Sequence, residues 1–383
     1  LDMLALGIIV PVLPKLIIAF KDGNTASAAT IFGLFETTWA AMQFIFAPLL
    51  GAISDRFGRR PVILISTLGL GLDYLFMAAA PTLGWLLAGR IISGITSSSY
   101  ATAFAYIADV TPREQRAAKY GLLGAAFGIG FIIGPAVGGL LGGINLRLPF
   151  WVAGGLSLLG TAYGYFILPE SLGAARRPRV EWRRANPVGS LAMLRRHGPM
   201  LLGFGIAVFL YRLAHDSFQS LFVIYSDYRF GWTARTVGMV FAVIGIATMI
   251  VQAGMVRAAV RRFGERTTMM AGFTFGIIGF LVLGVAPTSP IFLLAIPFSA
   301  LFGLTFPAMQ GIMTSLVGDD EQGRLQGTIA SLTGMAGIIA PSLFNNVFSL
   351  VIDRWQGLVL PGTPWFIAAG LLVGAVIVVG RRS

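Results

Sequence analysis

Seven ionisable side chains interrupt the long apolar runs of this 383-residue sequence. They are Asp2, Glu36, Asp73, Arg90, Arg212, His215 and Asp216. A charged side chain in the middle of a bilayer costs at least about 2.5 to 3.5 kcal/mol, so it is expected to face a cavity or a partner. Buried carboxyl and imidazole groups can take up and release protons when a nearby cation tunes the exchange. The residues that we expect to couple to protons are Asp2, Glu36, Asp73, Arg90, His215 and Asp216.

Some of these residues allow a second interpretation. Asp2 could lie among lipid headgroups, and Glu36 could lie at an outer mouth. Arg212 and Asp216 are four residues apart, so they share one helical face and could form a self-contained ion pair. His215 is expected to point about 100° away from Asp216 around the helix. It could titrate near neutral pH or only hydrogen-bond between helices.

Composition excludes several classes of protein. Hydrophobic residues make up 56% of the chain and charged residues 11%, against roughly 25% charged in soluble domains. The net charge is +12, but the cations are scattered between apolar runs, so no nucleic-acid partner is expected. With no cysteine and only two histidines, the sequence predicts no disulfide, thiol chemistry, metal or cofactor. It shows no nucleophile, metal set or phosphate-binding loop, so we expect no ATP hydrolysis, and the low charged fraction argues against an aqueous enzyme.

The apolar runs predict an all-α integral membrane protein. A helix needs about 20 apolar residues to cross a bilayer, and twelve such runs are present. They cover residues 1–20, 28–50, 61–80, 83–108, 117–141, 149–168, 200–225, 233–256, 267–286, 290–317, 325–352 and 364–379. The first run opens at Leu1 without an initiator methionine, which predicts a short cytoplasmic start before it.

The distribution of Lys and Arg predicts the orientation. If the loops between consecutive runs are numbered from the N-terminus, twenty of them fall in the even-numbered loops and the C-terminal tail. Six fall on the opposite side of the membrane. Because short basic loops stay in the cytoplasm, both termini are predicted to be cytoplasmic. Residues 169–199 form a long Arg-rich polar stretch that reads as a cytoplasmic linker between halves 1–168 and 200–383.

The two halves are related by an internal repeat. Arg56, Phe57, Gly58 and Arg60 recur 206 positions later, at Arg262, Phe263, Gly264 and Arg266. Five residues of the fifth run recur at the same offset: Gly121, Gly128, Ile132, Ile133 and Pro135 match Gly327, Gly334, Ile338, Ile339 and Pro341. Duplicated six-span halves are a known plan of transporters, with substrate bound near the midplane and alternating access by rocking.

Three motifs resemble those of a known family. Residues 51–62, GAISDRFGRRPV, resemble the signature loop of the major facilitator superfamily. Residues 90–94, RIISG, resemble its proton-coupling motif, and residues 130–139, GFIIGPAVGG, resemble its antiporter motif. Much of the first half is similar to the tetracycline/proton antiporters. The resemblance implies two pseudo-symmetric bundles of six helices that export drugs in exchange for protons.

Two positions depart from the tetracycline/proton antiporters. These proteins carry an ionisable His late in the eighth span and an Asp in the ninth. The aligned residues are Thr248 and Gly276, which carry no charge. These two uncharged residues argue against tetracycline as the substrate. They also argue against the family's proton pathway in the second half of the chain.

The resemblance also implies two mechanical motifs. Residues of the signature loop, together with Asp109 at the end of the fourth span, are expected to latch the cytoplasmic side shut, or else only to anchor the topology. They are Gly51, Asp55, Arg56, Gly58, Arg59, Arg60 and Asp109. Small residues of the fifth span are expected to let helices approach closely, with a proline that permits a kink: Gly130, Gly134, Pro135, Gly138 and Gly139.

Substrate-facing candidates lie on the spans that line the central cavity in this superfamily. They are Gln43, Ser98, Tyr100, Tyr211, Gln219, Phe306, Met309 and Gln310. Aromatic and Met walls with few fixed polar groups suit amphipathic ligands. We therefore expect a monomeric, proton-coupled exporter of amphipathic drugs or small metabolites in a bacterial inner membrane. Two alternatives are a uniporter or proton symporter of a small polar nutrient and a non-transporting membrane receptor or scaffold.

Overall fold

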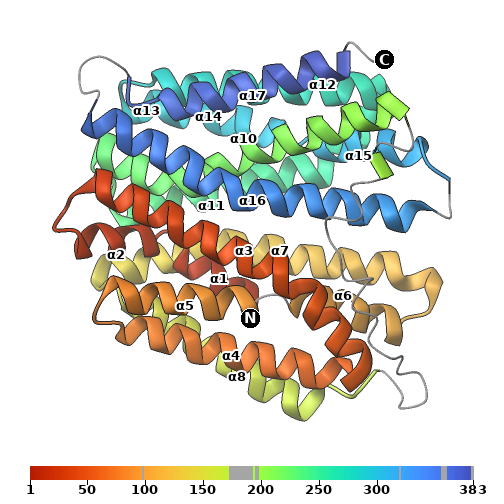
Figure 1. The fold of residues 1–383 in the computed structure, drawn as a ribbon, viewed down its shortest axis with the longest axis horizontal. Coiled ribbons are helices and arrows are strands. Elements are labelled where there is room, and N and C mark those ends of the chain that lie inside the picture. The colour runs from red at the N-terminus through yellow and green to blue at the C-terminus, as the bar shows by residue number, and fades with distance from the viewer. Residues whose placement is uncertain (97–98, 172–192, 195–197, 319–320, 355–359, 381–383) are drawn as a thin grey trace. The chain divides into compact units, whose positions relative to one another are not determined.

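The computed structural model describes the whole chain except residues 97–98, 172–192, 195–197, 319–320, 355–359 and 381–383 (Figure 1). Within the described part every regular element is a helix. The helices of the first half are α1 (Asp2–Ile9), α2 (Leu13–Phe20), α3 (Thr25–Phe57), α4 (Arg59–Ala79), α5 (Leu83–Thr96), α6 (Ser99–Val110), α7 (Arg113–Ile144) and α8 (Leu148–Ile167). Those of the second half are α10 (Gly198–Phe230), α11 (Ala234–Ile250), a π-helical turn (Val251–Met255), α12 (Val256–Val285), α13 (Ser289–Leu293), α14 (Ala295–Phe302), α15 (Thr305–Ser315), α16 (Gln322–Asp353) and α17 (Thr363–Gly380).

The lengths of these helices fit the predicted membrane architecture. Among the described residues, ten helical segments are long and apolar enough to cross a bilayer. One of them, Ala234–Val285, has 52 residues, which is enough for two crossings. The apolar helix α5 is shorter and is followed by α6. The expected all-α fold of twelve spans is confirmed.

The first and the tenth predicted spans are divided into shorter helices at or near prolines, which lack the amide donor of a continuous helix. Pro11 follows α1, and the amide of Val12 donates instead to Ile9, three residues back. The tenth span consists of α13, α14 and α15, which contain Pro290, Pro297 and Pro307.

The two predicted loops that carry the repeated Arg-Phe-Gly motif are largely helical. Helix α3 runs to Phe57 and α4 begins at Arg59, so only Gly58 lies between them. In the second half, α12 is kinked at Gly264. Gly58 has φ 109° and ψ 153°, and Gly264 has φ 81° and ψ 163°. Residues other than glycine rarely adopt such positive φ values. The repeated glycine therefore preserves one sharp turn in both halves.

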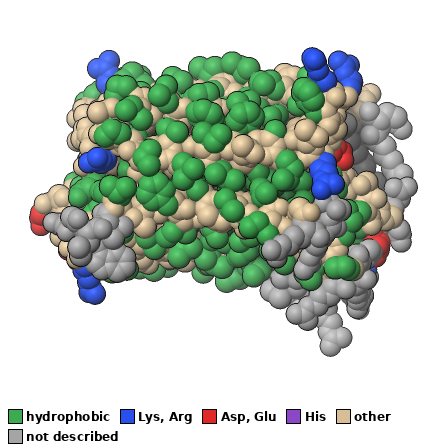
Figure 2. All heavy atoms as spheres, turned by 90° about the horizontal axis from the view of Figure 1, so that it is seen from above, with side chains coloured by type: hydrophobic (Ala, Val, Ile, Leu, Met, Phe, Trp, Pro, Cys, Tyr) green, Lys and Arg blue, Asp and Glu red, His purple; other side chains and the backbone are tan. Residues whose placement is uncertain are grey.

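The exposed surface is apolar along the helices. Large hydrophobic side chains such as Ile65, Leu72, Leu159 and Phe166 are exposed on α4 and α8. On the face shown in Figure 2, hydrophobic side chains cover the middle, and Lys and Arg side chains lie towards the ends. This distribution suits helices whose outer surface meets lipid and whose ends meet water.

The chain forms two compact units. Unit 1 comprises Leu1–Gly23, Thr38–Asn186 and Trp232–Ala242, and unit 2 comprises Asn24–Thr37, Pro187–Gly231 and Val243–Ser383. The first part of α3 therefore belongs to unit 2, and the first part of α11 belongs to unit 1. Most of the predicted linker 169–199 lies outside the described residues, and the division at residues 168 and 199 remains a prediction.

Each unit is held together by a different kind of packing. In unit 1, α1 packs on α7 and α4 packs on α8 (Figure 1). In unit 2, α10 packs on α16 and α17 around aromatic rings. The buried Trp365 of α17 contacts Tyr225 of α10 at 5.5 Å and Phe280 of α12 at 6.2 Å between ring centroids.

Glycines allow α1 and α7 to approach closely in unit 1. A Cβ atom on Gly134 would lie 2.6 Å from the Cα of Gly7, and one on Gly130 would lie 2.6 Å from the Cβ of Met3. Gly139 instead faces the first part of α11, where its added Cβ would lie 2.9 Å from the Cα of Gly238. The small residues of α7 thus serve two interfaces of the same unit.

A substitution in α7 should test this packing. A Cβ on Gly138 would overlap the carbonyl oxygen of Ile8 and lie 2.7 Å from the carbonyl carbon, so backbone would have to move. We expect Gly138→Ala to lower the thermal midpoint of the purified protein, with a loss of roughly 1 to 3 kcal/mol. Gly128→Ala is the matched control, because no atom of another residue lies near its added Cβ. Equal midpoints for the two variants would contradict the close contact.

Candidate functional site

A cluster of three ionisable side chains lies on α10. One oxygen of Asp216, Oδ1, is 3.2 Å from an Arg212 guanidinium nitrogen and 3.2 Å from Nδ1 of His215. The predicted Arg212–Asp216 pair is therefore present. The side chain of Asp216 is 15% exposed, whereas that of His215 is 35% exposed. The carboxylate thus lies deeper than the imidazole.

The prediction that His215 points away from Asp216 is wrong. The two Cβ atoms do leave the helix in directions about 100° apart. Each side chain nevertheless extends beyond its Cβ, and the imidazole leans back to Oδ1 of the neighbouring carboxylate. Rotamer choice therefore joins the two residues that helical geometry alone would separate.

Aromatic rings from three other helices surround Tyr211, one turn before His215. The ring of Tyr211 is nearly parallel to that of His215, at 6.0 Å, and to that of Phe306 on α15, at 5.7 Å. Phe302 of α14 approaches Tyr211 at 4.7 Å, and Phe273 of α12 at 6.4 Å. Tyr211 and Phe302 are buried, whereas His215 and Phe306 are partly exposed. The cluster thus presents an imidazole and a phenyl ring backed by three further aromatic rings.

Sequence reasoning missed Phe302, which has no motif around it. The ring of Phe302 occupies the space that a side chain at position 276 would need, which explains why a glycine fits there. A Cβ on Gly276 would run into the ring of Phe302 and lie 2.8 Å from Leu372. A carboxylate side chain has no room there in this structure. Thr248 lies in α11, three residues before the π-helical turn, and is partly exposed.

The charged pair of unit 1 lies between α3, α4 and α5. Asp73 on α4 is 2% exposed and Arg90 on α5 is 6% exposed. The Arg90 guanidinium lies over the Trp39 ring of α3, 5.0 Å from its centroid. Neither carboxyl oxygen of Asp73 has a hydrogen-bond partner among the described residues. A buried carboxylate without a hydrogen bond is costly, so this carboxyl is suited to exchange a proton.

Two further acids of the predicted proton set lie elsewhere. Asp2 is on α1, and its buried Oδ1 has no hydrogen-bond partner among the described residues. Glu36 is on the part of α3 that belongs to unit 2. Its neighbour Thr37 is 2.7 Å from the Ser342 hydroxyl and donates a hydrogen bond to the carbonyl of Ile338, both on α16. The predicted proton residues are thus divided between the two units.

The α3–α4 junction gathers the charges of the signature loop around Arg59. Its guanidinium contacts Asp55 at 2.6 Å and Asp109 of α6 at 3.1 Å, and it also donates to Ser54. Glu170, which sequence reasoning placed in the linker, accepts a hydrogen bond from the Arg59 amide at 2.9 Å. Ser171 donates to Asp109. The cluster is larger than predicted, because α8 ends beside it.

The remaining signature residues have other contacts. Arg60 donates to the carbonyl of Tyr165, and Arg56 lies over the ring of Phe57. The Gly51 carbonyl accepts a hydrogen bond from Ser54, and a side chain on Gly58 would collide with Glu170. Arg59, rather than the Arg56–Arg60 group as a whole, connects the acids.

The other predicted substrate residues are not all exposed. Gln43, Gln219 and Gln310 have exposed surface, and Gln310 donates to Gln326 at 2.9 Å. Met309 is fully buried, so in this structure it cannot contact a ligand. Ser98 and the side chain of Tyr100 lie outside the described residues.

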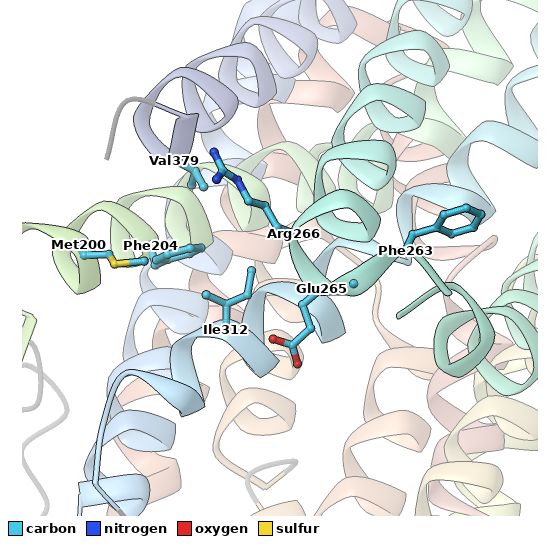
Figure 3. Close-up of a pocket in the computed structure, with 8 residues that line it drawn as sticks. Met200, Phe204, Phe263, Glu265, Arg266, Ile312 and Val379 are labelled. Carbon is cyan, nitrogen blue, oxygen red and sulfur yellow. The ribbon is translucent and has the colours of Figure 1, made fainter. Parts of the chain in front are cut away.

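A cavity of about 480 Å³ lies at the kink of α12, apart from these groups (Figure 3). Its walls are mostly apolar and come from α10, α12, α15 and α17: Met200, Phe204, Phe263, Gly264, Glu265, Arg266, Ile312 and Val379. Glu265, the repeat equivalent of Arg59, packs against Gly311. The second half therefore keeps the turn of the motif but carries the opposite charge at the position of Arg59.

Comparisons with known proteins agree with this fold. A profile of the Major Facilitator Superfamily matches residues 1–341 and 206–382. The tetracycline resistance protein of class C from Escherichia coli is 39% identical over 375 residues, 97% of this chain and 91% of that protein. The class H protein from Pasteurella multocida is 38% identical, over 94% of this chain and 89% of that protein.

The chain belongs to the major facilitator superfamily. Its fold is similar to that of the human organic anion transporter MFSD10 (TETRAN), with a TM-score of 0.72 and 23% identity over 99% of this chain and 96% of that one. The nucleoside transporter NupG gives a TM-score of 0.80 at 14% identity, over 100% of this chain and 96% of that one. The protein is thus a multi-pass membrane transporter and not an enzyme, and the predicted resemblance is confirmed.

The Arg59 cluster yields a prediction about stability. Arg59→Gln should leave Asp55 and Asp109 without their shared cation, because both contact the same guanidinium. Hydrogen bonds to charged groups are worth about 1.5 to 3 kcal/mol, so the thermal midpoint should fall by several degrees. Arg56→Gln is the control, since Arg56 lies over Phe57. An equal fall in both variants would show that loop charge alone matters.

Proposed function

We propose that this transporter exports amphipathic drugs or small metabolites in exchange for protons, by alternating access. The observation that carries the proposal is the Asp73 carboxyl. It is 2% exposed, lacks a hydrogen-bond partner among the described residues and lies on a helix packed against that of Arg90. A buried acid near a cation can release a proton in one state and rebind it in another. A passive channel or receptor does not need such a group within an apolar span.

The relatives support a drug as cargo, because they are named for tetracycline resistance. The packing of unit 2 favours a substrate other than tetracycline. The resemblance to the tetracycline/proton antiporters implies an Asp at the position of Gly276, and in this chain Phe302 fills the space that such a side chain would need. The exposed surfaces of His215 and Phe306 suit a flat, partly apolar molecule.

Each group of residues has a role in this proposal. Asp2, Glu36, Asp73, Arg90, His215 and Asp216 carry or tune protons, and the cluster around Arg59 latches the cytoplasmic side. The proposal places both chain termini in the cytoplasm and the monomer in a bacterial inner membrane. The cytoplasmic position of the termini is supported by the excess of Lys and Arg in the even-numbered loops.

Reconstitution tests the direction of transport. The purified protein is placed in liposomes with a pH-sensitive dye inside, and candidate aromatic drugs are added outside. An exchanger should move protons out as the drug enters, so the interior should become alkaline. Acidification together with uptake would instead establish a symporter, and uptake without proton movement would establish a uniporter.

Two acids should be needed for coupling but not for binding. Asp2→Asn and Glu36→Gln should abolish uphill transport driven by a pH gradient, because neither amide can carry a proton. Drug binding, measured by thermal shift, should remain. Asp22→Asn is the control: Asp22 is exposed, and its φ of 52° suits asparagine. Undiminished uphill transport in both test variants would rule out this assignment.

The latch makes a separate prediction about populations. If Asp55 stabilises the outward-facing state through Arg59, Asp55→Asn should shift the protein towards the inward-facing state. A shift of about 1.4 kcal/mol changes the ratio of states tenfold. The readout is labelling of Gln310→Cys, a partly exposed position in a chain without native cysteine. Labelling from the cytoplasmic side should increase, and unchanged labelling would leave the cluster as a topology anchor.

A further inference from the structure

The cavity at the kink of α12 lies at one end of the helices of unit 2. Met200 is the third residue of α10, Ile312 lies in the last turn of α15, and Val379 is the last but one residue of α17. Its volume of about 480 Å³ falls within the usual range of ligand sites, about 300 to 1,000 Å³. In a membrane protein the ends of long apolar helices lie where hydrocarbon gives way to lipid headgroups.

The wall of the cavity is apolar inside and charged at its rim. Phe204 and Val379 are buried, whereas Phe263 and Arg266 are exposed. The Arg266 side chain extends towards Val379, and that of Glu265 extends in the opposite direction, where it packs against Gly311 (Figure 3). The cavity therefore combines an apolar interior with a guanidinium at its edge.

The first part of α12 is strongly basic. Residues 257–266 contain four exposed arginines and one glutamate: Arg257, Arg261, Arg262, Arg266 and Glu265. The Arg262 guanidinium lies over the ring of Phe263, 5.5 Å from its centroid, so a second cation adjoins the cavity wall. Clusters of Lys and Arg at a membrane surface attract anionic lipids, and guanidinium groups bind phosphate oxygens through paired hydrogen bonds.

The internal repeat shows that the matching turn of the first half holds a negative charge. The amide of Arg59, directly after Gly58, donates to the Glu170 carboxylate, and a Cβ on Gly58 would collide with that carboxylate. In the second half no described atom outside the adjoining chain lies within 4 Å of a Cβ added to Gly264, which lines the cavity. A carboxylate of the chain thus occupies the first turn, and the second turn opens into the cavity.

We infer that this cavity binds an anionic phospholipid, with one acyl chain against Phe204 and Ile312 and the phosphate on Arg266. The lipid supplies at the second turn the negative charge that Glu170 supplies at the first. Burial of the acyl chain and the charge-assisted hydrogen bonds of the phosphate stabilise the complex separately. Binding therefore requires both parts of the lipid.

Native mass spectrometry of the purified protein in detergent tests this inference. The probes are dioleoyl phosphatidylglycerol, dioleoyl phosphatidylcholine with the same chains, and inorganic phosphate. The first phosphatidylglycerol should bind about tenfold more tightly than phosphatidylcholine, and inorganic phosphate at the same concentration should not displace it. Equal affinity for the two lipids, or displacement by phosphate, would overturn the inference.

Substitution of arginine separates this site from the general positive charge of α12. Arg266→Gln should lower the affinity for phosphatidylglycerol about tenfold and remove the preference over phosphatidylcholine. Arg257→Gln is the matched control, because Arg257 is an exposed arginine of the same helix outside the described wall of the cavity. An equal loss in both variants would show attraction by a diffuse positive surface and would contradict a site at Arg266.

A change in the apolar wall tests the acyl chain. Ile312→Phe should occupy part of the cavity and weaken phosphatidylglycerol binding, whereas Ile312→Val, the control, leaves the cavity open. The thermal midpoint without lipid shows that each variant is folded. Unchanged binding in Ile312→Phe would contradict the position of the chain. Because binding is measured without a drug or a pH gradient, its failure would leave the proposed exchange of drug for protons untouched.

Discussion

A charge inside a hydrocarbon layer must be paired or enclosed, and this constraint explains the arrangement of the ionisable groups. Arg212 and Asp216 meet within one helix, so their pairing needs no other element. Arg90 is covered by the Trp39 ring and lies on the helix beside that of Asp73, so that pair depends on the packing of α3, α4 and α5. Arg59 lies at a helix junction and contacts two acids from different helices. The first pair is local, whereas the other groups depend on how several helices pack together.

The internal repeat preserves backbone geometry more closely than it preserves chemistry. Gly58 and Gly264 share a left-handed turn, and Pro135 and Pro341 both lie inside long helices. The carbonyls of these prolines each face a glycine: Pro135 faces Gly238, and Pro341 faces Gly33. The charges differ, because Glu265 occupies the place of Arg59. Turns and close approaches are thus common to both halves, whereas the position of Arg59, which forms ion pairs in the first half, carries the opposite charge in the second.

The sequence could predict what local rules determine. Bilayer thickness limits the length of a span, so apolar runs predicted the twelve crossings, and four-residue spacing predicted the Arg212–Asp216 pair. Contacts made by tertiary packing could not be predicted in this way. Glu170 reaches the Arg59 amide across 111 positions of sequence because α8 ends beside the α3–α4 junction. The contact of His215 with Asp216 depends on rotamers, which spacing does not determine. The burial of Met309 depends on which face of α15 packs inwards.

The aromatic cluster and the glycine at position 276 have one physical cause. A ring at position 302 needs the space beside α12, and only a residue without a side chain provides it. The same ring packs on Tyr211, whose neighbour in the cluster is His215. The imidazole of His215 on α10 also lies 6.3 Å from the Phe302 ring. One ring thus fills the space beside Gly276 and borders the ionisable cluster of α10, so packing at position 276 and the surroundings of His215 depend on the same side chain.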